Sequence, residues 1–422
     1  MPRPSLFLLS ALALTLTSTA GCGPDVTGVF DETTSSGSAG DGGGGTGGDA
    51  GTGGVTTAPT TGGGGTTTTT PTSTTSAPCG PGGANEDQDG DGFTPATGDC
   101  DDCDPEVNPN AIDFPGGVDE DCNGVTNDVL TPCDEAVAMD TQDPKAILKA
   151  VELCKISKGE NDWGVSDAVW SLPDGAPIPA GEEQDFHRGH GVLADFGPGT
   201  PPRAGKSLLA LSSGAARDAQ DPGYQSPQGF NKGYTSNPAP GFPKETPECN
   251  VQTGTPNDAI ALNIALRVPS NAHAISYDYT FYAFDFPGFV CSNFNDTHFA
   301  LFEPKLPGMP DLNVAYDELG HPITLNGANF HVCTCQNGPP CSAGNKMYPC
   351  DQGTAALMGT GFEGHGATGW LTTTIPVEPG TNISLRWGIY DAGDGTFEST
   401  VLIDNFQWKK DPVEALSNAQ AE

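Results

Sequence analysis

Residues 262–268 read LNIALRV and residues 275–281 read ISYDYTF, and these two stretches decide the fold class. In each of them apolar side chains occupy alternate positions, which is the period of a β-strand with one face in a hydrophobic core. The pattern returns in residues 383–389 (ISLRWGI), and residues 400–408 (TVLIDNFQW) close the strand-rich part of the chain. Because Gly- and Pro-rich loops separate these strands, we predict a mainly β protein, an antiparallel sandwich of the jelly-roll type.

The strand-rich domain is expected to span residues 131–410, which is long enough to bury a sizeable core and holds most of the aromatic residues. A short helix should open it, because Asp143 can cap a helix and Pro144 suits the first helical position. Apolar residues then recur at helical spacing, namely Ala146, Ile147, Ala150, Val151 and Cys154. Residues 411–422 are expected to form a flexible tail.

The first 21 residues have the features of a signal peptide. Arg3 precedes an apolar stretch, residues 6–14, that is too short to span a bilayer. Residues 20–22 (AGC) resemble the end of a bacterial lipobox, which implies that Cys22 is diacylated on sulfur and becomes the first mature residue. Thr19 stands where that motif usually has Leu, and residues 18–20 also fit an ordinary cleavage site, so plain secretion stays open.

The composition also favours export. The chain has 13 cysteines, and setting Cys22 aside leaves an even 12, which could close six disulfides in an oxidising compartment. The formal net charge is -37, and no Lys or Arg occurs between Arg3 and Lys145. Such a chain should avoid nucleic acid and anionic surfaces and should attract cations.

Residues 22–78 are expected to be a disordered linker behind the lipidated Cys22. They consist mostly of Gly, Thr, Ser and Ala, with homopolymer runs at residues 42–45, 62–65 and 66–70. Such a sequence has too little apolar surface to offset the entropy of ordering the chain. We therefore predict a flexible tether between the membrane and the rest of the protein.

Residues 79–130 form an acidic segment that contains the beginning of an EF-hand-like loop. The loop reads DQDGDGF at residues 87–93. The carboxylates of Asp87, Asp89 and Asp91 alternate along it, and the carbonyl of Phe93 offers a further oxygen ligand. Alternating oxygen ligands are the way in which such a loop begins to wrap a hard cation.

The twelfth position of this loop, where an EF-hand has Glu, is Gly98. Asp99, Asp101 or Asp102 would therefore have to close the ligand shell, and Asp102 is our candidate among them. Calcium in such an incomplete loop fits a structural role better than a switching role.

A second loop, DEDCNGV at residues 119–125, repeats the spacing. Its candidate ligands are Asp119, Asp121 and Asn123, and the loop ends near Asp128. The alternative is that both loops are only solvated acidic turns. We favour cation binding, because unpaired carboxylates in a segment without basic residues repel one another unless something neutralises them.

Four stretches of this segment resemble the metal-binding repeat of bacterial surface proteins of the MopE type. They are residues 89–93 (DGDGF), 98–102 (GDCDD), 104–111 (DPEVNPNA) and 118–124 (VDEDCNG). The resemblance implies one metal-binding module of a kind often found in several copies. Some members of that family bind copper, but no His or Met lies between residues 79 and 128, so we favour calcium.

The chain departs from this repeat at one cysteine. The family usually has a Cys after its Pro-Gly-Ala stretch, where this chain reads DFPGG at residues 113–117. Cys103 lies where the family normally has another residue, and it would replace the missing partner. The resemblance then implies the pairs Cys100 with Cys122 and Cys79 with Cys103, although spacing alone leaves other connectivities open.

The strand-rich domain resembles the bacterial choice-of-anchor L domain over most of residues 133–408. The stretches that carry the likeness are residues 150–154 (AVELC), 191–197 (GVLADFG), 211–214 (LSSG), 277–281 (YDYTF), 286–287 (FP), 295–297 (NDT) and 398–405 (ESTVLIDN). Members are attached to the cell surface by differing devices, and a lipidated Cys22 would be the device here. The resemblance implies a surface location and no established activity.

A search for catalytic motifs gives little support for an enzyme. Residues 187–191 (HRGHG) bring two imidazoles close in sequence, but a zinc protease places them on a helix with a Glu between them. Residues 211–214 (LSSG) lack the Gly-x-Ser-x-Gly turn of a hydrolase. We therefore predict that the protein is not an enzyme.

A second calcium site is a candidate near the two last strands, where Asp391, Asp394 and Asp404 lie. The DAGDG stretch at residues 391–395 would then be a cation-holding turn that fixes the final strand. A solvated hairpin turn is an equal alternative.

The remaining cysteines are expected to form disulfides. Cys133 with Cys154 and Cys249 with Cys291 are the expected pairs. The cluster of Cys333, Cys335, Cys341 and Cys350 has the residue type for zinc, but outside the cytoplasm two local disulfides are favoured.

The sequence thus favours a lipid-anchored protein of the outer membrane or cell surface, with plain secretion as the alternative. Its calcium-stabilised loops and β-sandwich would serve adhesion or ligand binding. Exposed aromatics such as Tyr282, Phe284 and Phe289 would meet a glycan or a surface protein. A purely structural envelope protein and a secreted hydrolase without a recognisable motif are the alternatives.

Overall fold

The computed structural model describes residues 79–80, 82–127, 132–159, 162–246, 248–249, 254–336 and 338–421. They belong to one compact unit, Thr74–Glu422. The signal peptide at residues 1–21, Cys22, the linker at residues 22–78 and Asp128 lie outside the described residues. Over the described ranges, no helix has the length and hydropathy needed to cross a bilayer.

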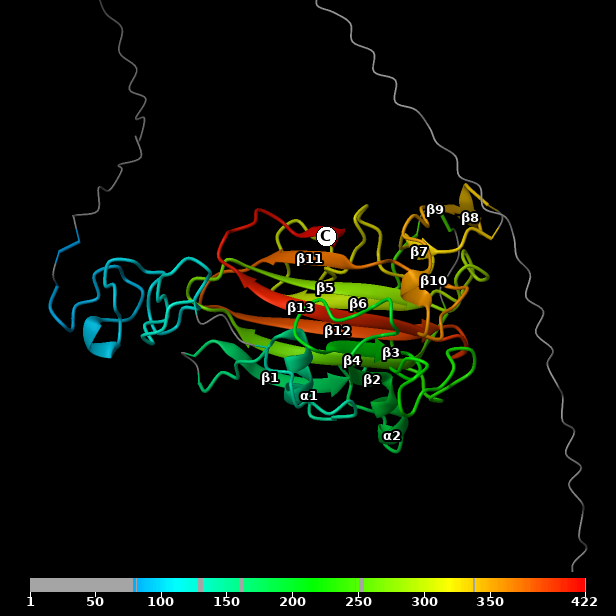
Figure 1. Ribbon diagram of the computed structural model, residues 1–422, viewed down its shortest axis with the longest axis horizontal. Coiled ribbons are helices and arrows are strands. Elements are labelled where there is room, and N and C mark those ends of the chain that lie inside the picture. Colours follow the sequence, from blue (N-terminus) through cyan, green and yellow to red (C-terminus); the bar gives the residue numbers. More distant parts are fainter. Residues whose placement is uncertain are drawn as a thin grey trace, which may run out of the picture. The chain divides into compact units, whose positions relative to one another are not determined.

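Two antiparallel sheets pack as a sandwich, with their strands running in similar directions (Figure 1). The first sheet has the order β1 (Gly164–Ser171), β4 (Pro256–Arg267), β12 (Asn382–Ala392), β6 (Thr297–Glu303). The second has the order β14 (Ser417–Gln420), β11 (Leu371–Pro376), β5 (Ala274–Ala283), β13 (Ser399–Lys409), β3 (Leu208–Ser212), β2 (His190–Leu193). The short strands β10 (Gly366–Ala367) and β7 (Val332–Cys333) extend it beside β5, and β8 (Cys341–Ala343) pairs with β9 (Lys346–Tyr348).

The strands predicted from alternation form the centre of this sandwich, which confirms the mainly β antiparallel fold. The two segments that open the sequence argument are β4 and β5, and the later two are β12 and β13. Their inward side chains share one buried cluster, in which the Tyr277 ring of β5 meets Trp387 of β12 edge to face at 5.2 Å. Core burial of such large rings supplies much of the driving force for packing the sheets.

The outer faces of both sheets are buried as well, which alternation alone does not indicate. All ten residues of β5 are buried. Tyr282 on its outer face packs with Phe196 and Phe362 in a second cluster, while Phe299 and Tyr390 lie in a third cluster on the first sheet. Loops therefore cover surfaces that a period-two pattern assigns to solvent.

The opening helix is shorter than its apolar spacing suggests. The side chain of Asp143 accepts from the Lys145 amide, and α1 (Pro144–Ile147) continues as the 3₁₀ turn η2 (Leu148–Val151). Glu152 then has φ +64°, which ends the helix before Cys154. The remaining helical turns are η1 (Pro95–Thr97), α2 (Glu183–Phe186), η3 (His187–Gly189) and η4 (Ala355–Leu357).

The end of the chain is not a free tail. Residues Ser417–Gln420 form β14, which pairs antiparallel with β11 from Thr374 to Leu371. The structure thus corrects the expectation of flexibility for residues 411–422, because β11 would otherwise present an unpaired edge.

The acidic segment, residues 82–127, has almost no regular structure and contacts the loop between β4 and β5. The Asn271 carboxamide accepts from the Ile112 amide at 3.0 Å and donates to the Ile112 carbonyl at 2.9 Å. The Ser270 amide donates to the Asn110 carbonyl at 3.0 Å. Asn271 is fully buried, so these bonds hold the segment against the sandwich.

Candidate functional site

The first acidic loop brings three carboxylates together. Oxygens of Asp87, Asp89 and Asp91 all lie within 4.8 Å of one another. The Asp87 carboxylate accepts from the amides of Gly90 and Gly92 at 2.7 and 3.1 Å, and both glycines have positive φ. These turns aim the alternating side chains inward. One oxygen each of Asp89 and Asp91 is buried without a hydrogen-bond donor, which leaves these oxygens free to bind a cation.

Asp99, and not Asp102, faces this triad. Asp102 accepts from the backbone and side-chain amides of Gln88 at 3.1 and 2.8 Å, so its oxygens are already engaged. Asp99 is 6% exposed and its Oδ2 has no donor. Burial, with added repulsion from Asp91, raises the pKa of Asp99. Asp99 is therefore a stronger candidate for closing the ligand shell than Asp102, the candidate chosen from the sequence. Phe93 ends the loop, with its amide bound to Asp91 Oδ1 at 2.7 Å.

The second loop gathers Asp119, Asp121 and Asp113, whose oxygens also lie within 4.8 Å of one another. Asp113 is almost fully buried, with Oδ2 lacking a donor, while its Oδ1 accepts from the amides of Glu120 and Asp121 at 2.8 and 3.1 Å. Asp113 was not among the predicted ligands, because it lies upstream of the loop that begins at Asp119. The Asn123 amide nitrogen donates to Asp121 at 2.9 Å and so supports the loop.

A third acidic group, which we call the four-carboxyl cluster, lies at one end of the sandwich and consists of Asp285, Asp296, Asp391 and Glu398. Each is at most 2% exposed. Asp296 accepts from the Ala392 amide at 3.0 Å and from the Ser399 hydroxyl at 2.6 Å. Both oxygens of Asp391, both oxygens of Glu398 and Oδ2 of Asp285 have no donor.

Burial dominates the electrostatics of this cluster. Removal from water, followed by repulsion from Asp296, raises the pKa of Asp391 to about 11 and that of Asp285 to about 9. Burial raises the pKa of Asp296 to about 7. It also raises the pKa of Glu398 well above its usual value, although the Lys232 ammonium and the Ser213 hydroxyl act in the opposite direction. Negative charge is thus costly here without a counter-ion.

Only part of the predicted site near the last strands comes together. Asp394 lies beside the cluster with an exposed side chain, whereas Asp404 belongs to another group. Asp404 accepts from the amides of Ala204 and Asn405 and lies by Glu152. Burial and the neighbouring Asp404 raise the pKa of Glu152 to about 9. Asp391 lies at the end of β12 near the start of β13, whereas Asp404 lies further along β13, six residues beyond Glu398.

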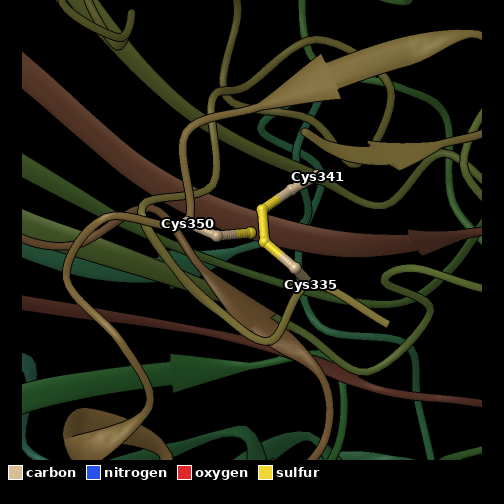
Figure 2. A group of neighbouring side chains, drawn as sticks. All are labelled: Cys335, Cys341 and Cys350. Carbon is tan, nitrogen blue, oxygen red and sulfur yellow. A yellow bond between two sulfur atoms is a disulfide. The ribbon is translucent and has the colours of Figure 1, made fainter. Parts of the chain in front are cut away.

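The cysteine cluster is made of disulfides. Figure 2 shows the bond between Cys335 and Cys341 with the Cys350 sulfur beside it, and Cys350 is itself bonded to Cys333. A metal would need thiolates, which paired sulfurs do not supply. The other pairs, which are also those expected, are Cys79–Cys103, Cys100–Cys122, Cys133–Cys154 and Cys249–Cys291. These disulfides indicate an extracytoplasmic protein.

The two histidines of the HRGHG stretch contact each other. His187 Nδ1 and His190 Nε2 are 2.8 Å apart, and the His190 ring stacks on Trp170 at 4.3 Å. Burial lowers the pKa of His190 to about 3. A surface cavity of about 560 Å³ adjoins His187 and Arg217. Among the described residues, neither histidine belongs to a group of three clustered ligand atoms, so the pair offers little to a metal.

A row of partly exposed rings runs past the four-carboxyl cluster, and we call it the aromatic row. Phe284 stacks on His365 at 3.5 Å and on Phe397 at 5.6 Å, and Phe289 lies 5.5 Å from Phe397 and 5.4 Å from Phe294. Phe289 is 37% exposed. Tyr282, expected at the surface, is instead buried, with its hydroxyl 3.0 Å from that of Thr200.

Phe397 has an unusual backbone. Its φ is +70°, which is rare for a bulky residue and is kept only where the surroundings enforce it. Phe397 directly precedes Glu398 of the four-carboxyl cluster. The conformation of one residue therefore affects both the aromatic row and the acidic cluster.

Residues 206–407 match the choice-of-anchor L domain. No match was found among curated proteins. Two similar solved structures are a complex of TmCBM61 with β-1,4-galactotriose and the mannan-recognising carbohydrate-binding module TmCBM27. The first has 8% identity, covers 57% of this chain and 86% of that chain, and has a TM-score of 0.21. The second has 11% identity, covers 58% and 96%, and has a TM-score of 0.20.

The choice-of-anchor L domain begins just before β3 and ends within β13. It contains the four-carboxyl cluster and the aromatic row, but not the two acidic loops or the helix at Pro144. The two kinds of candidate site therefore lie in different parts of the chain.

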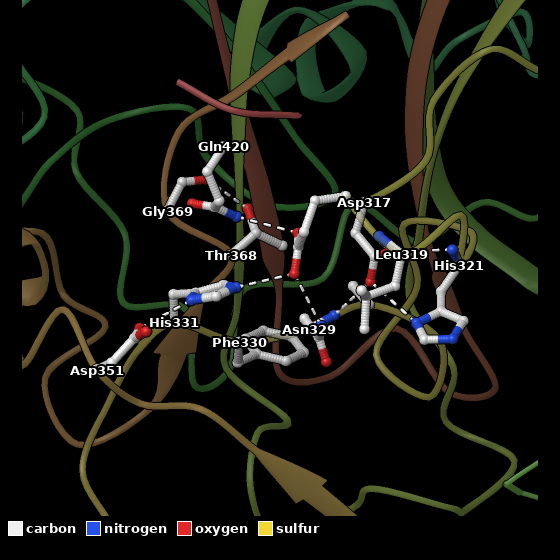
Figure 3. Close-up of polar contacts among 12 residues, drawn as sticks. Asp317, Leu319, His321, Asn329, Phe330, His331, Asp351, Thr368, Gly369 and Gln420 are labelled. Atoms are coloured by element: carbon white, nitrogen blue, oxygen red, sulfur yellow. Dashed lines mark hydrogen bonds and ion pairs between the residues drawn. The ribbon is translucent and has the colours of Figure 1, made fainter. Parts of the chain in front are cut away.

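The choice-of-anchor L domain also contains a network around His331 (Figure 3). The His331 ring lies between Asp351, at 2.8 Å, and Glu318, at 3.0 Å. Glu318 also accepts from the Asn329 amide at 2.9 Å and from the Gln420 amide at 3.1 Å. Through Gln420 the network joins β14 to the loop that carries Glu318.

Proposed function

We propose that the protein is an exported surface module that binds calcium in its two acidic loops and a ligand on its β-sandwich. The observation that carries the calcium proposal is the pair of carboxylate triads, in which Asp89, Asp91 and Asp113 each have a buried oxygen without a donor. Hard oxygen ligands in flexible loops suit calcium. Its role here is structural, since it offsets the repulsion within a highly acidic segment.

Calcium titration by calorimetry tests this part of the proposal. The mature protein is expected to bind calcium, and the double variant Asp89→Asn, Asp121→Asn is expected to lose the ions bound by the loops. Asp411→Asn, an exposed change outside the loops, is the matched control and should bind like the unchanged protein. Loop binding unaltered in the double variant would overturn the proposal.

We propose that lipid on Cys22 attaches the mature protein to the outer membrane or cell surface. The signal peptide, the lipobox-like AGC stretch and the extracytoplasmic disulfides support this reading. Mass spectrometry of the protein purified from its native membrane should find a diacylated Cys22 as the first residue. An unlipidated mature start at Gly21 would make the protein a secreted one.

For the ligand we propose a neutral glycan that stacks its sugar rings on the aromatic row. Exposed ring faces favour the apolar C–H surfaces of sugars. The net charge of -37 disfavours acidic glycans. Phe289→Ala is expected to weaken binding on a glycan array, whereas Met347→Ala, which removes another exposed apolar side chain, should not.

The same assay separates the alternative functions. We propose binding without catalysis, so captured glycans should be recovered intact after incubation. Degraded glycans, with the degradation lost on changing one carboxylate, would favour a hydrolase. Absence of any glycan binding by the calcium-loaded protein would leave a structural envelope role or a protein ligand.

A further inference from the structure

The four-carboxyl cluster draws its members from both sheets at one end of the sandwich. Asp285 follows β5 and Glu398 precedes β13 in the second sheet, while Asp296 precedes β6 and Asp391 ends β12 in the first. The cluster therefore joins the ends of four strands from two parts of the chain, residues 285–296 and residues 391–398. A group held there would fasten the two sheets to each other.

Two donors near the cluster serve Asp296, and the Ser213 hydroxyl lies close enough to Glu398 to act against the burial that raises its pKa. The Ala392 amide and the Ser399 hydroxyl both donate to Asp296. Five oxygens of Asp285, Asp391 and Glu398 remain buried without a donor. Buried polar atoms normally have hydrogen-bond partners. Several oxygens without one in a single cluster point to a bound ligand there.

Burial raises the pKa of Glu398 and the Lys232 ammonium acts to lower it, but among the described residues these two groups form no ion pair. The nearest buried ammonium, Lys232, donates to the Ser212 carbonyl at 3.1 Å. Among the described contacts no ion pair joins a Lys, Arg or His to any of the four carboxylates. A buried carboxyl without a paired cation takes up a proton instead of staying charged, and a metal ion would replace that proton.

We infer that the four-carboxyl cluster is a third cation site, which takes a divalent calcium-type ion through Asp391, Glu398, Asp285 and Asp296. The ligand set is all oxygen, which favours calcium or magnesium over zinc or copper. Of the described carboxylates, only the loop triads already have three side chains with oxygens within 4.8 Å of one another. Closing the cluster on an ion thus requires side-chain rotation, which suits the flexible shell of calcium better than the strict octahedron of magnesium.

The proposed ion would also fix the loop that carries Phe397. Asp391 and Glu398 flank this loop, which contains Gly393 and Gly395 at positive φ and Phe397 at φ +70°. Holding both ends on one ion restrains a segment that would otherwise be able to open. The aromatic row, whose Phe397 stacks on Phe284, would be preorganised by the cation.

Calcium titration in a background without the acidic loops tests the inference. The full mature chain carrying Asp89→Asn and Asp121→Asn should still bind one calcium ion. Adding Asp391→Asn should remove that ion and abolish the calcium-induced rise in melting temperature. Adding Asp411→Asn to the same background is the control and should change neither result.

The titrations distinguish failure of the proposed loop sites from failure of the proposed third site. If the loop-deficient background binds no calcium while the unchanged protein does, the third site is overturned and the loop sites stand. If calcium binding survives Asp391→Asn in that background, the assignment to this cluster is wrong. Near-ultraviolet circular dichroism in EDTA shows whether Asp391→Asn folds. If it does not fold, Glu398→Gln is the second variant. Retention of the ion in Glu398→Gln would equally overturn the inference.

Discussion

At the scale of single residues, the role of each carboxylate follows from what donates to it. Asp102 and Asp99 are three residues apart, and the sequence alone does not distinguish them as candidate ligands. Asp102 receives two hydrogen bonds from Gln88, whereas Asp99 keeps a buried oxygen without a donor. A carboxylate that already accepts amide donors supports a loop, and one that lacks them can bind a cation.

We therefore expect Asp99→Asn and Asp102→Asn to have opposite effects. Asp99→Asn should weaken calcium binding by the first loop in calorimetric titration, with little loss of stability in EDTA. Asp102→Asn should retain most of the calcium affinity but lower the free energy of unfolding by about 1 kcal/mol, because the bond from the Gln88 side chain to Oδ2 is lost. Equal losses of affinity in the two variants would contradict this division.

His331 provides a pH-dependent contribution to stability at the same scale. Hydrogen bonds to Glu318 and Asp351, partly offset by burial, raise the pKa of His331 above its ordinary value of 6.5. Although burial opposes it, hydrogen bonding to His331 and Asn329 lowers the pKa of Glu318 to about 2. The histidine contribution is fully present below pH 6.5 and is lost as the pH rises through its raised pKa. The glutamate contribution is present above pH 4.5 and is lost as the pH falls towards 2.

The stabilisation by this pair should consequently be greatest between about pH 4.5 and 6.5. His331→Gln is expected to cost about 1 kcal/mol in that range and less above pH 8, as measured by urea unfolding at several pH values. The groups that face His331 are Glu318 and Asp351. A destabilisation that is constant with pH would show that the pair does not titrate in this way.

At the scale of elements, β14 shows how a polar terminal stretch becomes ordered. Its sequence, SNAQ, has no apolar alternation. It is held by its ladder with β11 and by the bond from Gln420 to Glu318. Leu416, just before it, packs against the main core.

Removing residues 411–422 should destabilise the protein by about 1–3 kcal/mol, because ladder bonds and the Leu416 contact are lost and β11 becomes an exposed edge. Thermal unfolding measures the loss, and light scattering should detect more self-association. Gln420→Ala, which removes only one side-chain bond, is the control and should cost less. A truncated chain as stable as the full one would mean that β14 contributes nothing to the fold.

At the scale of the whole described unit, the acidic segment is held on the sandwich through Asn271. This side chain satisfies both backbone groups of Ile112 in a buried position. The contact spans a long sequence separation, so it links the acidic segment to the choice-of-anchor L domain. A salt link from Lys410 to Glu106 at 3.6 Å lies in the same region.

Asn271→Ala should release the acidic segment, because the Ile112 amide and carbonyl lose their partners at a cost of about 1–3 kcal/mol. Hydrogen exchange in residues 82–127 is expected to speed up while exchange in β5 and β13 stays slow. Asn293→Ala, on an exposed loop, is the matched control and should leave exchange in the segment unchanged. Unaltered exchange in Asn271→Ala would show that the remaining contacts, such as those of Ser270 with Asn108 and Asn110, are enough to hold the segment.

The candidate sites could be predicted from the sequence where their ligands lie within a few residues of one another. The loops at Asp87 and Asp119 have their ligands within a few residues, so spacing reveals them without a tertiary structure. Asp113 was not predicted as a ligand, because it lies upstream of its loop, across the turn at residues 115–117. Asp404 does not lie with Asp391, because it is six residues beyond Glu398 along β13 and lies beside Glu152.

The sequence by itself determined the fold class and the acidic loops of this protein. Alternation in β4, β5, β12 and β13 reflects the two-residue period of a strand beside a core, and that signal is local. Only the tertiary structure decided that β14 pairs with β11, that Tyr282 is covered and that Asp285, Asp296, Asp391 and Glu398 meet. The physical reason is that burial and charge proximity depend on strands and loops distant in sequence, and no local pattern specifies which of them will pack together.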